Sequence, residues 1–277
     1  MIDMHDAESA RPRLRVLHQL GRSGGTLIAK GLAVMDDAVL LSEVHPYGRI
    51  LVKRNGRRAL RHIPAVQAHQ WFGLITGEEL EAFKFKDRPS DFAAEILLIA
   101  ARCKAKGKNL IVRDYNNVDF TGISFRARPP FHFSTVEVLR DRFRILRYFT
   151  VRHPADQWLS LSKLFTDDIT PQLERFLHGF RLFSEQAAEI GFVRYEDFTV
   201  NPDAKLRLIC TALDLPYGPE WRERWADYRK ITGDKRARAG NDAIAPAARR
   251  PLAPALQRRF ERNPDYRKSL ELLGYPS

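Results

Sequence analysis

Residues 14–35 read LRVLHQLGRSGGTLIAKGLAVM: a short apolar run, a glycine-rich loop and then a helical pattern. The apolar run at 14–20 predicts a strand that ends at Gly21, and a helix is expected to begin near Thr26. Glycines let the backbone of such a loop approach a ligand with its N–H groups turned inward. The N-terminus of the next helix favours negative charge. The stretch predicts an anion site at the end of the first strand, although an ordinary glycine-rich turn fits the loop alone equally well.

The loop departs from the nucleoside-triphosphate P-loop pattern G-x-x-x-x-G-K-[ST]. Thr26 stands five residues after Gly21, where that pattern has its second glycine, and no Lys-Ser or Lys-Thr pair follows. Without the lysine and the metal-binding hydroxyl, magnesium-assisted transfer of a γ-phosphoryl group is not expected. A P-loop kinase or nucleotidase is therefore the alternative enzyme class rather than the preferred one.

Further apolar runs of strand type alternate with helical patterns along the chain. The predicted strands cover residues 39–41, 109–113, 144–151 and 192–195, and the main predicted helices cover 65–75, 90–106, 170–190, 201–213, 255–262 and 266–273. This alternation predicts an α/β fold, a parallel sheet with helices on both faces, and short, continuously apolar strands suit such a sheet. We interpret 1–277 as one domain, with 46–106 as a helical insertion over the site that holds the acceptor.

The composition suits a globular protein that binds anions. Among 277 residues, 46 are Lys or Arg and 34 are Asp or Glu, a net charge of +12, and such an excess attracts polyanions at long range. No apolar run approaches the roughly 20 residues that span a membrane, and residues 1–13 contain no apolar signal segment, so we expect a cytoplasmic protein. The two cysteines, Cys103 and Cys210, are expected to be reduced and buried in helices.

A second candidate anchor, VRHPADQWLSL, occupies residues 151–161. Arg152 lies at the carboxyl end of a predicted strand, where open parallel sheets bind ligands. Pro154 suits the first turn of a helix. Ser160 follows Arg152 by eight residues, so its hydroxyl is expected a little over two helical turns along, facing the same ligand. The alternative is a salt-bridging arginine beside an unrelated helix serine.

The order of these segments resembles the sulfotransferase family, whose donor is 3′-phosphoadenosine 5′-phosphosulfate. GRSGGTL resembles the phosphosulfate-binding loop of that family, SEVHP at 42–46 the segment with the acceptor base, and VRHPADQWLS the segment that binds the donor's 3′-phosphate. RYEDFTVNPDAKLRLICTALDLPY at 194–217 is similar to a structural stretch of the family, so residues 195–197 are interpreted as structural. ITGDKRARAG, within the predicted loop 231–250, resembles the late loop that closes over the nucleotide.

The resemblance implies a P-loop-like sulfotransferase architecture, that donor as co-substrate, and no metal. It assigns donor binding to Arg22, Ser23, Gly24, Gly25, Thr26, Leu27, Arg152, Ser160, Lys235, Arg236 and Arg238. Two features depart from the cytosolic small-molecule branch of the family. That branch usually has lysine where Arg22 stands, and its Lys-Thr-His segment is absent here.

Sulfuryl transfer needs positive charge on the sulfuryl oxygens and a base for the acceptor. Preorganised donors normally supply the largest catalytic effect, and we assign that role to Arg22, the backbone of the loop glycines, and Thr26. Glu43 is the first candidate for the base. His45 competes with it as a ring that titrates near neutrality, and Asp114, at the tip of the strand 109–113, is the third candidate.

Two alternatives of other classes stay open. One is a basic nucleic-acid-binding protein, yet no zinc pattern, aromatic RNA-binding motif or obvious basic helix stands in the sequence, so nucleic acid is not the expected partner. The other is a sulfotransferase fold that binds the donor without catalysis. The expected acceptor is a small molecule, a carbohydrate or a peptide that offers a hydroxyl or an amine, and the oligomeric state is left open.

Overall fold

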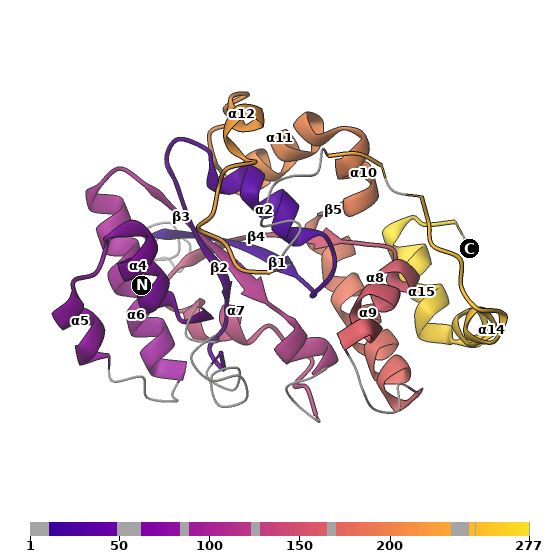
Figure 1. Cartoon of the computed structure of the whole chain (residues 1–277). Helices are drawn as coiled ribbons and strands as arrows, with labels where there is room; N and C mark the ends of the chain where they lie inside the picture. Colours follow the sequence, from indigo (N-terminus) through magenta and orange to yellow (C-terminus); the bar gives the residue numbers. More distant parts are fainter. Residues whose placement is uncertain are drawn as a thin grey trace, which may run out of the picture.

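The structure, a computed structural model, describes residues 11–48, 62–83, 89–122, 128–164, 170–233, 244–246 and 248–276. The described residues form a five-stranded parallel sheet in the order β2-β3-β1-β4-β5 (Figure 1). The strands are β1 Arg13–Gln19, β2 Ala38–Val44, β3 Asn109–Tyr115, β4 Arg144–Val151 and β5 Phe192–Arg194. The predicted α/β class and parallel sheet are confirmed.

Helices cover both faces of this sheet (Figure 1). They are α2 Gly25–Ala33, α4 Pro64–Phe72, α5 Gly77–Ala82, α6 Pro89–Ala105, α7 Ser134–Leu139, α8 Pro154–Leu161, α9 Thr170–Ile190, α10 Tyr195–Val200, α11 Pro202–Ala212, α12 Trp221–Arg224, α14 Pro254–Arg262 and α15 Pro264–Leu273. Cys103 in α6 and Cys210 in α11 are free and buried, as predicted. Among the described residues, no helix is both long and apolar enough to span a bilayer.

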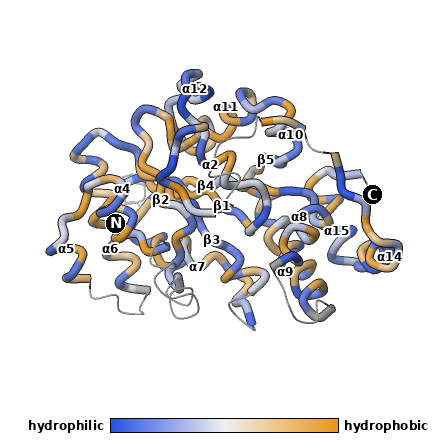
Figure 2. The backbone as a smooth tube through the Cα atoms, in the orientation of Figure 1, coloured by the Kyte–Doolittle hydropathy of each residue, from blue (hydrophilic) through white to orange (hydrophobic). Residues whose placement is uncertain are grey.

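The core is built on the alternation of strand side chains between the two faces of the sheet. Val16 and Leu41 pack with α4 and α6 on one face, whereas Leu17 and Leu40 pack with α2 and α11 on the other. A third cluster surrounds Phe149 of β4 and includes residues of α8, α9 and α15. Both faces of the strands therefore carry apolar side chains, and hydrophobic segments lie among the central strands in Figure 2.

The helical stretch between β2 and β3 connects these two neighbouring parallel strands. Ala65 of α4 and Ile96 of α6 belong to the same buried cluster as Val16 of β1. A capping box begins α5, since Thr76 Oγ1 accepts from Glu79 N–H over 3.2 Å and a carboxylate oxygen of Glu79 accepts from Thr76 N–H over 2.8 Å. The described part of 46–106 thus belongs to the core of the sheet. Its interpretation as an acceptor lid, and that of the chain as one domain, stay predictions.

A π-helical turn, Asn117–Thr121, follows β3 and packs against α9. The sequence analysis did not predict this turn. At Gly179 the two backbones lie so close that a Cβ on α9 would overlap the carbonyl of Phe120. Glycine is therefore required at this point of a long helix, although glycine weakens helix interiors.

We predict that Gly179→Ala lowers the free energy of unfolding by about 1–3 kcal/mol, because the added methyl group must push two backbones apart. Gly77→Ala is the matched control, since a Cβ at Gly77 meets no atom within 4 Å. That substitution should be neutral or stabilise by up to about 1 kcal/mol. Urea denaturation of both variants and the parent measures the difference. Equal stability of the two variants would contradict the close packing of α9.

Candidate functional site

The glycine-rich loop joins β1 to α2 at the carboxyl end of the sheet. Gly24, the N-cap of α2, has a φ of 82°, in the left-handed region that glycine favours. A Cβ at Gly24 would overlap the ring of Tyr195, and a Cβ at Gly25 would overlap the side-chain oxygen of Gln19. Both glycines are therefore required by close packing.

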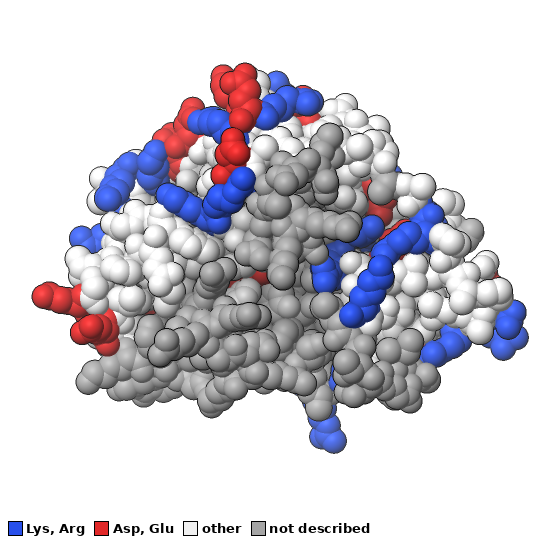
Figure 3. All heavy atoms as spheres, in the orientation of Figure 1, with Lys and Arg blue, Asp and Glu red and all other residues white. Residues whose placement is uncertain are grey.

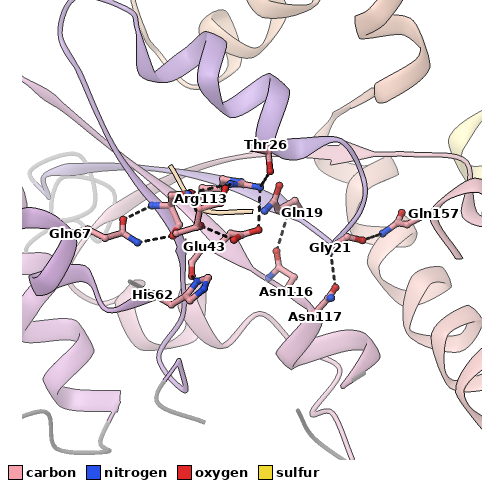
Figure 4. A network of polar contacts seen from close by, with 12 residues as sticks. Gln19, Gly21, Thr26, Glu43, His62, Gln67, Arg113, Asn116, Asn117 and Gln157 are labelled. Carbon is pink, nitrogen blue, oxygen red and sulfur yellow. Dashed lines mark hydrogen bonds and ion pairs between the residues drawn. The ribbon is translucent and has the colours of Figure 1, made fainter. Parts of the chain in front are cut away.

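Hydrogen bonds from two other segments hold the first residues of this loop. Gly21 N–H donates to Asn117 Oδ1 over 2.8 Å, and Gly21 O accepts from Gln157 Nε2 over 2.7 Å (Figure 4). The carbonyl of Arg22 accepts from Arg152 Nη1 over 3.4 Å. The structure thus brings the loop and the start of the second predicted anchor together.

The second anchor has the predicted strand-to-helix geometry. Arg152 follows β4, and its guanidinium lies 5.0 Å from the centre of the Tyr195 ring. Ser160 is half-buried near the C-terminal end of α8, which begins at Pro154 as predicted. Leu27, another residue predicted to bind the co-substrate, is half-buried in α2 and packs against the core. Tyr195, interpreted as structural from the sequence, contacts both Arg152 and the loop.

Buried polar atoms without a hydrogen-bond partner gather around the loop. In the part of the chain that the structure describes, these atoms are both amide atoms of Gln19, Ser23 Oγ, Thr150 Oγ1, Arg152 Nε and Gln157 Oε1. Buried polar groups in proteins are normally hydrogen-bonded, so each exception needs an explanation. An anionic ligand beside this helix N-terminus would satisfy the donors among them, which are Gln19 Nε2, Ser23 Oγ, Thr150 Oγ1 and Arg152 Nε.

Glu43 lies in a β-bulge near the carboxyl end of β2. The pairing register with β3 shifts between Ser42 and Val44, and Glu43 has a φ of 53°, which is strained for a residue other than glycine. Gln67 supports the bulge, because its amide group pairs with Ser42 N–H over 2.6 Å and Ser42 O over 2.7 Å. His62 Nδ1 lies 2.9 Å from Glu43 O. Bulges of this kind redirect a side chain, here toward the end of the sheet.

Arg113 of β3 links Glu43 to the loop (Figure 4). Its Nη2 lies 3.2 Å from Glu43 Oε1 and donates to Thr26 Oγ1 over 2.9 Å, while Nη1 donates to Ser42 Oγ over 3.0 Å. Burial lowers the pKa of Arg113, whose side chain is 2% exposed, and the carboxylate of Glu43 opposes this effect. An arginine remains charged even so. The structure therefore places a buried cation between the candidate base and the candidate anion loop.

His45 points toward the carboxylate of Asp119 and not toward that of Glu43. Its Nε2 lies 3.1 Å from Asp119 Oδ2, and both side chains are buried. Asp119 also accepts from the N–H and the hydroxyl of Ser134, over 2.8 and 2.6 Å. Within the described ranges, no group of three or more His, Cys, Asp or Glu side chains is placed to hold a metal ion. His45 is thus near Glu43 in sequence but belongs to a separate polar pair.

Asp114, the third candidate base, is enclosed on its own side of the sheet. Its carboxylate accepts from Thr135 Oγ1 and Asn116 Nδ2, each over 2.8 Å, and lies 3.1 Å from His18 Nδ1. Burial opposes the charged form of Asp114, but the hydrogen bonds with His18 and Thr135 lower its pKa below the ordinary value. The structure does not bring Asp114 together with Glu43 or the loop.

Tyr115 is a site residue that the sequence analysis missed. It ends β3, with its ring 5.9 Å from that of His62. Burial and the charge of Glu43 raise the pKa of Tyr115, whereas a hydrogen bond with Asn117 and the charge of Arg22 oppose the rise. These interactions place Arg22 at the same end of the sheet as Glu43. The roles predicted for Arg22, as a cation, and for Glu43, as the base, require this.

The predicted late loop begins directly against this site. Lys235, Arg236 and Arg238 lie outside the described residues. The segment before them is described as far as Gly233, where a Cβ would overlap Thr26 Oγ1. The neighbouring hydroxyl of Thr232 lies 2.6 Å from Glu43 Oε2.

The residues that sequence analysis left out share one recognisable feature. Gln19, Arg113 and Thr150 are polar residues near the carboxyl ends of their strands. Since ligands bind outside the carboxyl ends of parallel strands, polar side chains at these positions could have been assigned to the site.

Comparison with solved structures shows which known fold this is. The sulfotransferase domain of the Synechococcus PCC 7002 olefin synthase superimposes with a TM-score of 0.68 at 17% identity, covering 96% of each chain. A sulfotransferase from Alicyclobacillus acidocaldarius gives 0.47 at 11% identity over 97% of this chain and 98% of that one. Retinol dehydratase in complex with retinol and PAP gives 0.32 at 14% identity over 79% and 64%. No protein-family model and no curated protein matches the sequence. The first superposition shows that the chain has a sulfotransferase fold.

The start of α8 contains a histidine that is sensitive to pH. His153 is the N-cap of α8, and its Nδ1 accepts from Ala155 N–H over 3.3 Å. Arg249 contacts the same nitrogen over 3.0 Å and also pairs with Asp156. Figure 3 shows basic side chains on the surface in the region of α8. Burial and the charge of Arg249 lower the pKa of His153 to about 4. The ring must therefore be neutral to cap the helix.

We predict that acid destabilises the protein through His153. The folded pKa is below the ordinary value of 6.5, so the stabilisation is present above pH 6.5 and is lost as the pH falls toward 4. The loss attributable to this ring is about 2–3 kcal/mol. His153→Asn keeps an N-cap side chain but does not titrate. Denaturation between pH 7.5 and 4.5 should show a smaller loss for this variant. Parallel pH profiles for the two proteins would exclude His153 as the cause.

Proposed function

We propose that this chain is a sulfotransferase that moves a sulfuryl group from 3′-phosphoadenosine 5′-phosphosulfate to a hydroxyl or amine. The observation that carries the proposal is the cluster of unpartnered buried polar atoms around the glycine-rich loop, at Gln19, Ser23, Thr150 and Arg152. The sulfotransferase fold supports it independently. A small-molecule, carbohydrate or peptide acceptor and a cytoplasmic location stay expectations from the sequence.

The residues around the loop fit a donor with several anionic groups. The backbone at Gly24 and Gly25 begins α2, whose N-terminus favours an anion, and Ser23 adds an unpartnered hydroxyl. Arg152 and Ser160, on the strand end and the helix beyond it, would hold the 3′-phosphate. When bound, the donor supplies an activated sulfuryl group with a phosphate as its leaving group. Lys235, Arg236 and Arg238 stay predicted additions to this anchor.

The hydrogen bonds of Thr26 indicate a role for its hydroxyl. Its oxygen accepts a hydrogen bond from Arg113 Nη2 over 2.9 Å. A hydroxyl has one proton to donate, and this accepted bond leaves that proton for another group. Thr26 is therefore suited to donate to a sulfuryl oxygen, together with the charge of Arg22 and the backbone of the loop. Preorganised donors of this kind stabilise the charge that develops in the transition state.

Among the three candidate bases, the contacts favour Glu43. It is 7% exposed, whereas Asp114 is 0% exposed and its carboxylate is taken up by its own side of the sheet. His45 is directed toward Asp119. Glu43 instead contacts Arg113, which also donates to Thr26 of the glycine-rich loop. The strained backbone at Glu43 also supports a functional role.

A thermal-shift comparison of 3′,5′-adenosine diphosphate with AMP and ATP tests donor binding. The parent protein should respond selectively to the 3′-phosphate, since stabilisation follows RT ln(1 + [L]/Kd). Arg152→Gln should weaken binding by about ten- to a hundredfold, because one charge-assisted bond is lost. Arg258→Gln, an exposed arginine on α14, is the control and should bind like the parent. No preference for the 3′-phosphate would rule out the donor assignment.

Incubation with sulfur-labelled donor and pools of phenols, sugars, alcohols and amines tests catalysis. Glu43→Gln should lower kcat by about 10²–10⁴-fold, the usual contribution of a general base, while 3′,5′-adenosine diphosphate still binds. His45→Asn is tested alongside it. Loss of turnover in His45→Asn but not in Glu43→Gln would reassign the base. Absence of any labelled product from a parent protein that binds the donor would contradict the proposed activity.

A further inference from the structure

Thr232 directs all of its polar groups toward the residues around Glu43, although it lies 189 residues further along the chain. Its N–H donates to Ser42 Oγ over 3.1 Å, and its carbonyl accepts from Arg113 Nη1 over 3.2 Å. Its hydroxyl lies 2.6 Å from Glu43 Oε2. The side chain is buried in this network, which joins β2, β3 and the segment that follows α12.

The direction of each hydrogen bond in this network follows from the donors available. Ser42 Oγ accepts from Arg113 Nη1 and from Thr232 N–H, so its own proton is free to donate to Thr232 Oγ1, 3.0 Å away. The hydroxyl of Thr232 has two acceptors within reach, Glu43 Oε2 at 2.6 Å and Ser42 O at 3.2 Å. Its single proton goes to the nearer and charged one, the carboxylate of Glu43. Thr232 is therefore a donor to Oε2, with its orientation set by Ser42.

This bond constrains a torsion that the contact with Arg113 does not fix by itself. Arg113 binds Glu43 Oε1, but the terminal torsion of a glutamate has a broad energy profile, so one contact does not fix the plane of the carboxylate. The bond from Thr232 to Oε2 supplies the second point. Arg113 of β3 holds one oxygen and Thr232 holds the other, so the plane of the carboxylate is determined.

Gly233 brings the same segment against the anion loop. Its φ is 111°, and a Cβ there would overlap Thr26 Oγ1 and lie 3.5 Å from Glu43 Oε1. Only glycine allows the backbone to pass between these two side chains. Two consecutive residues thus touch the group that is proposed to accept the proton and the hydroxyl that is proposed to contact the sulfuryl group.

We propose that Thr232 is a positioning residue that fixes the plane of the Glu43 carboxylate and sets it in register with Thr26. This role rests on the proposed sulfotransferase function. It makes the first residues of the predicted nucleotide-closing loop part of the machinery that activates the acceptor. Charged and titratable groups that face Glu43 include Arg113 and Tyr115, with His62 at its carbonyl.

Three variants separate positioning from a merely structural role. Thr232→Val removes the donor at nearly constant shape, Thr232→Ser restores it, and Thr199→Val is the matched control. Thr199 is 4% exposed against 5% for Thr232, and its hydroxyl caps the Glu196 carbonyl in α10. None of these substitutions changes Arg113, Tyr115 or His62.

The first measurement is kcat and KM against pH, with labelled donor and the acceptor found in the labelling experiment. Thr232→Val should lower kcat by about ten- to a hundredfold, the effect of one charge-assisted bond. The acid limb of its profile should move to higher pH, because a bond to the ionised form is lost. Donor KM and binding of 3′,5′-adenosine diphosphate should stay within about twofold. Thr232→Ser and Thr199→Val should resemble the parent.

The second measurement is independent of any acceptor. The carboxyl ¹³C resonance of Glu43 is titrated in protein labelled at glutamate and identified by its absence in Glu43→Gln. Its midpoint should rise in Thr232→Val and return in Thr232→Ser. An unchanged midpoint in Thr232→Val overturns the positioning role, whether or not the parent transfers sulfuryl groups. If the parent labels no acceptor but the midpoint is shifted in Thr232→Val, the proposed function is contradicted. The positioning role of Thr232 is not contradicted by that result.

Discussion

The buried guanidinium of Arg113 is the interaction on which the site depends. It reaches the anion loop at Thr26, the bulge at Ser42 and Glu43, and the late segment at Thr232. A buried cation is tolerated only when its partners and hydrogen bonds offset the loss of water. The positions of α2, the β2 bulge and the segment at Thr232 are therefore coupled, because each supplies one of these partners.

Other elements provide the supports that this arrangement requires. The left-handed backbone at Glu43 costs on the order of 1–3 kcal/mol, and Gln67 and His62 supply the hydrogen bonds that the distorted strand lacks. The loop is held in turn by Asn117, from the π-helical turn, and by Gln157, from α8. The helices around the sheet thus fix the geometry of the site as well as cover the core.

Much of the fold could be predicted from the sequence because burial on both faces makes parallel strands continuously apolar. The predicted limits of β4 and α9 agree with the structure residue for residue, and the caps at Thr76 and Asn201 were recognisable from local patterns. The bulge at Glu43 and its bond from Thr232 could not be predicted, since they depend on contacts between distant segments. Local patterns can name candidate site residues, but not the distant partners that hold them.

The clamp that Gln67 forms on Ser42 has a second effect, which concerns aggregation. β2 is an edge strand of the sheet, and an open edge offers unpaired N–H and C=O groups to the strands of other molecules. The amide of Gln67 occupies both groups of Ser42, with the geometry of a neighbouring strand. The side chain that supports the bulge for chemistry therefore also closes this part of the edge, so that self-association through β2 is disfavoured by the same two hydrogen bonds.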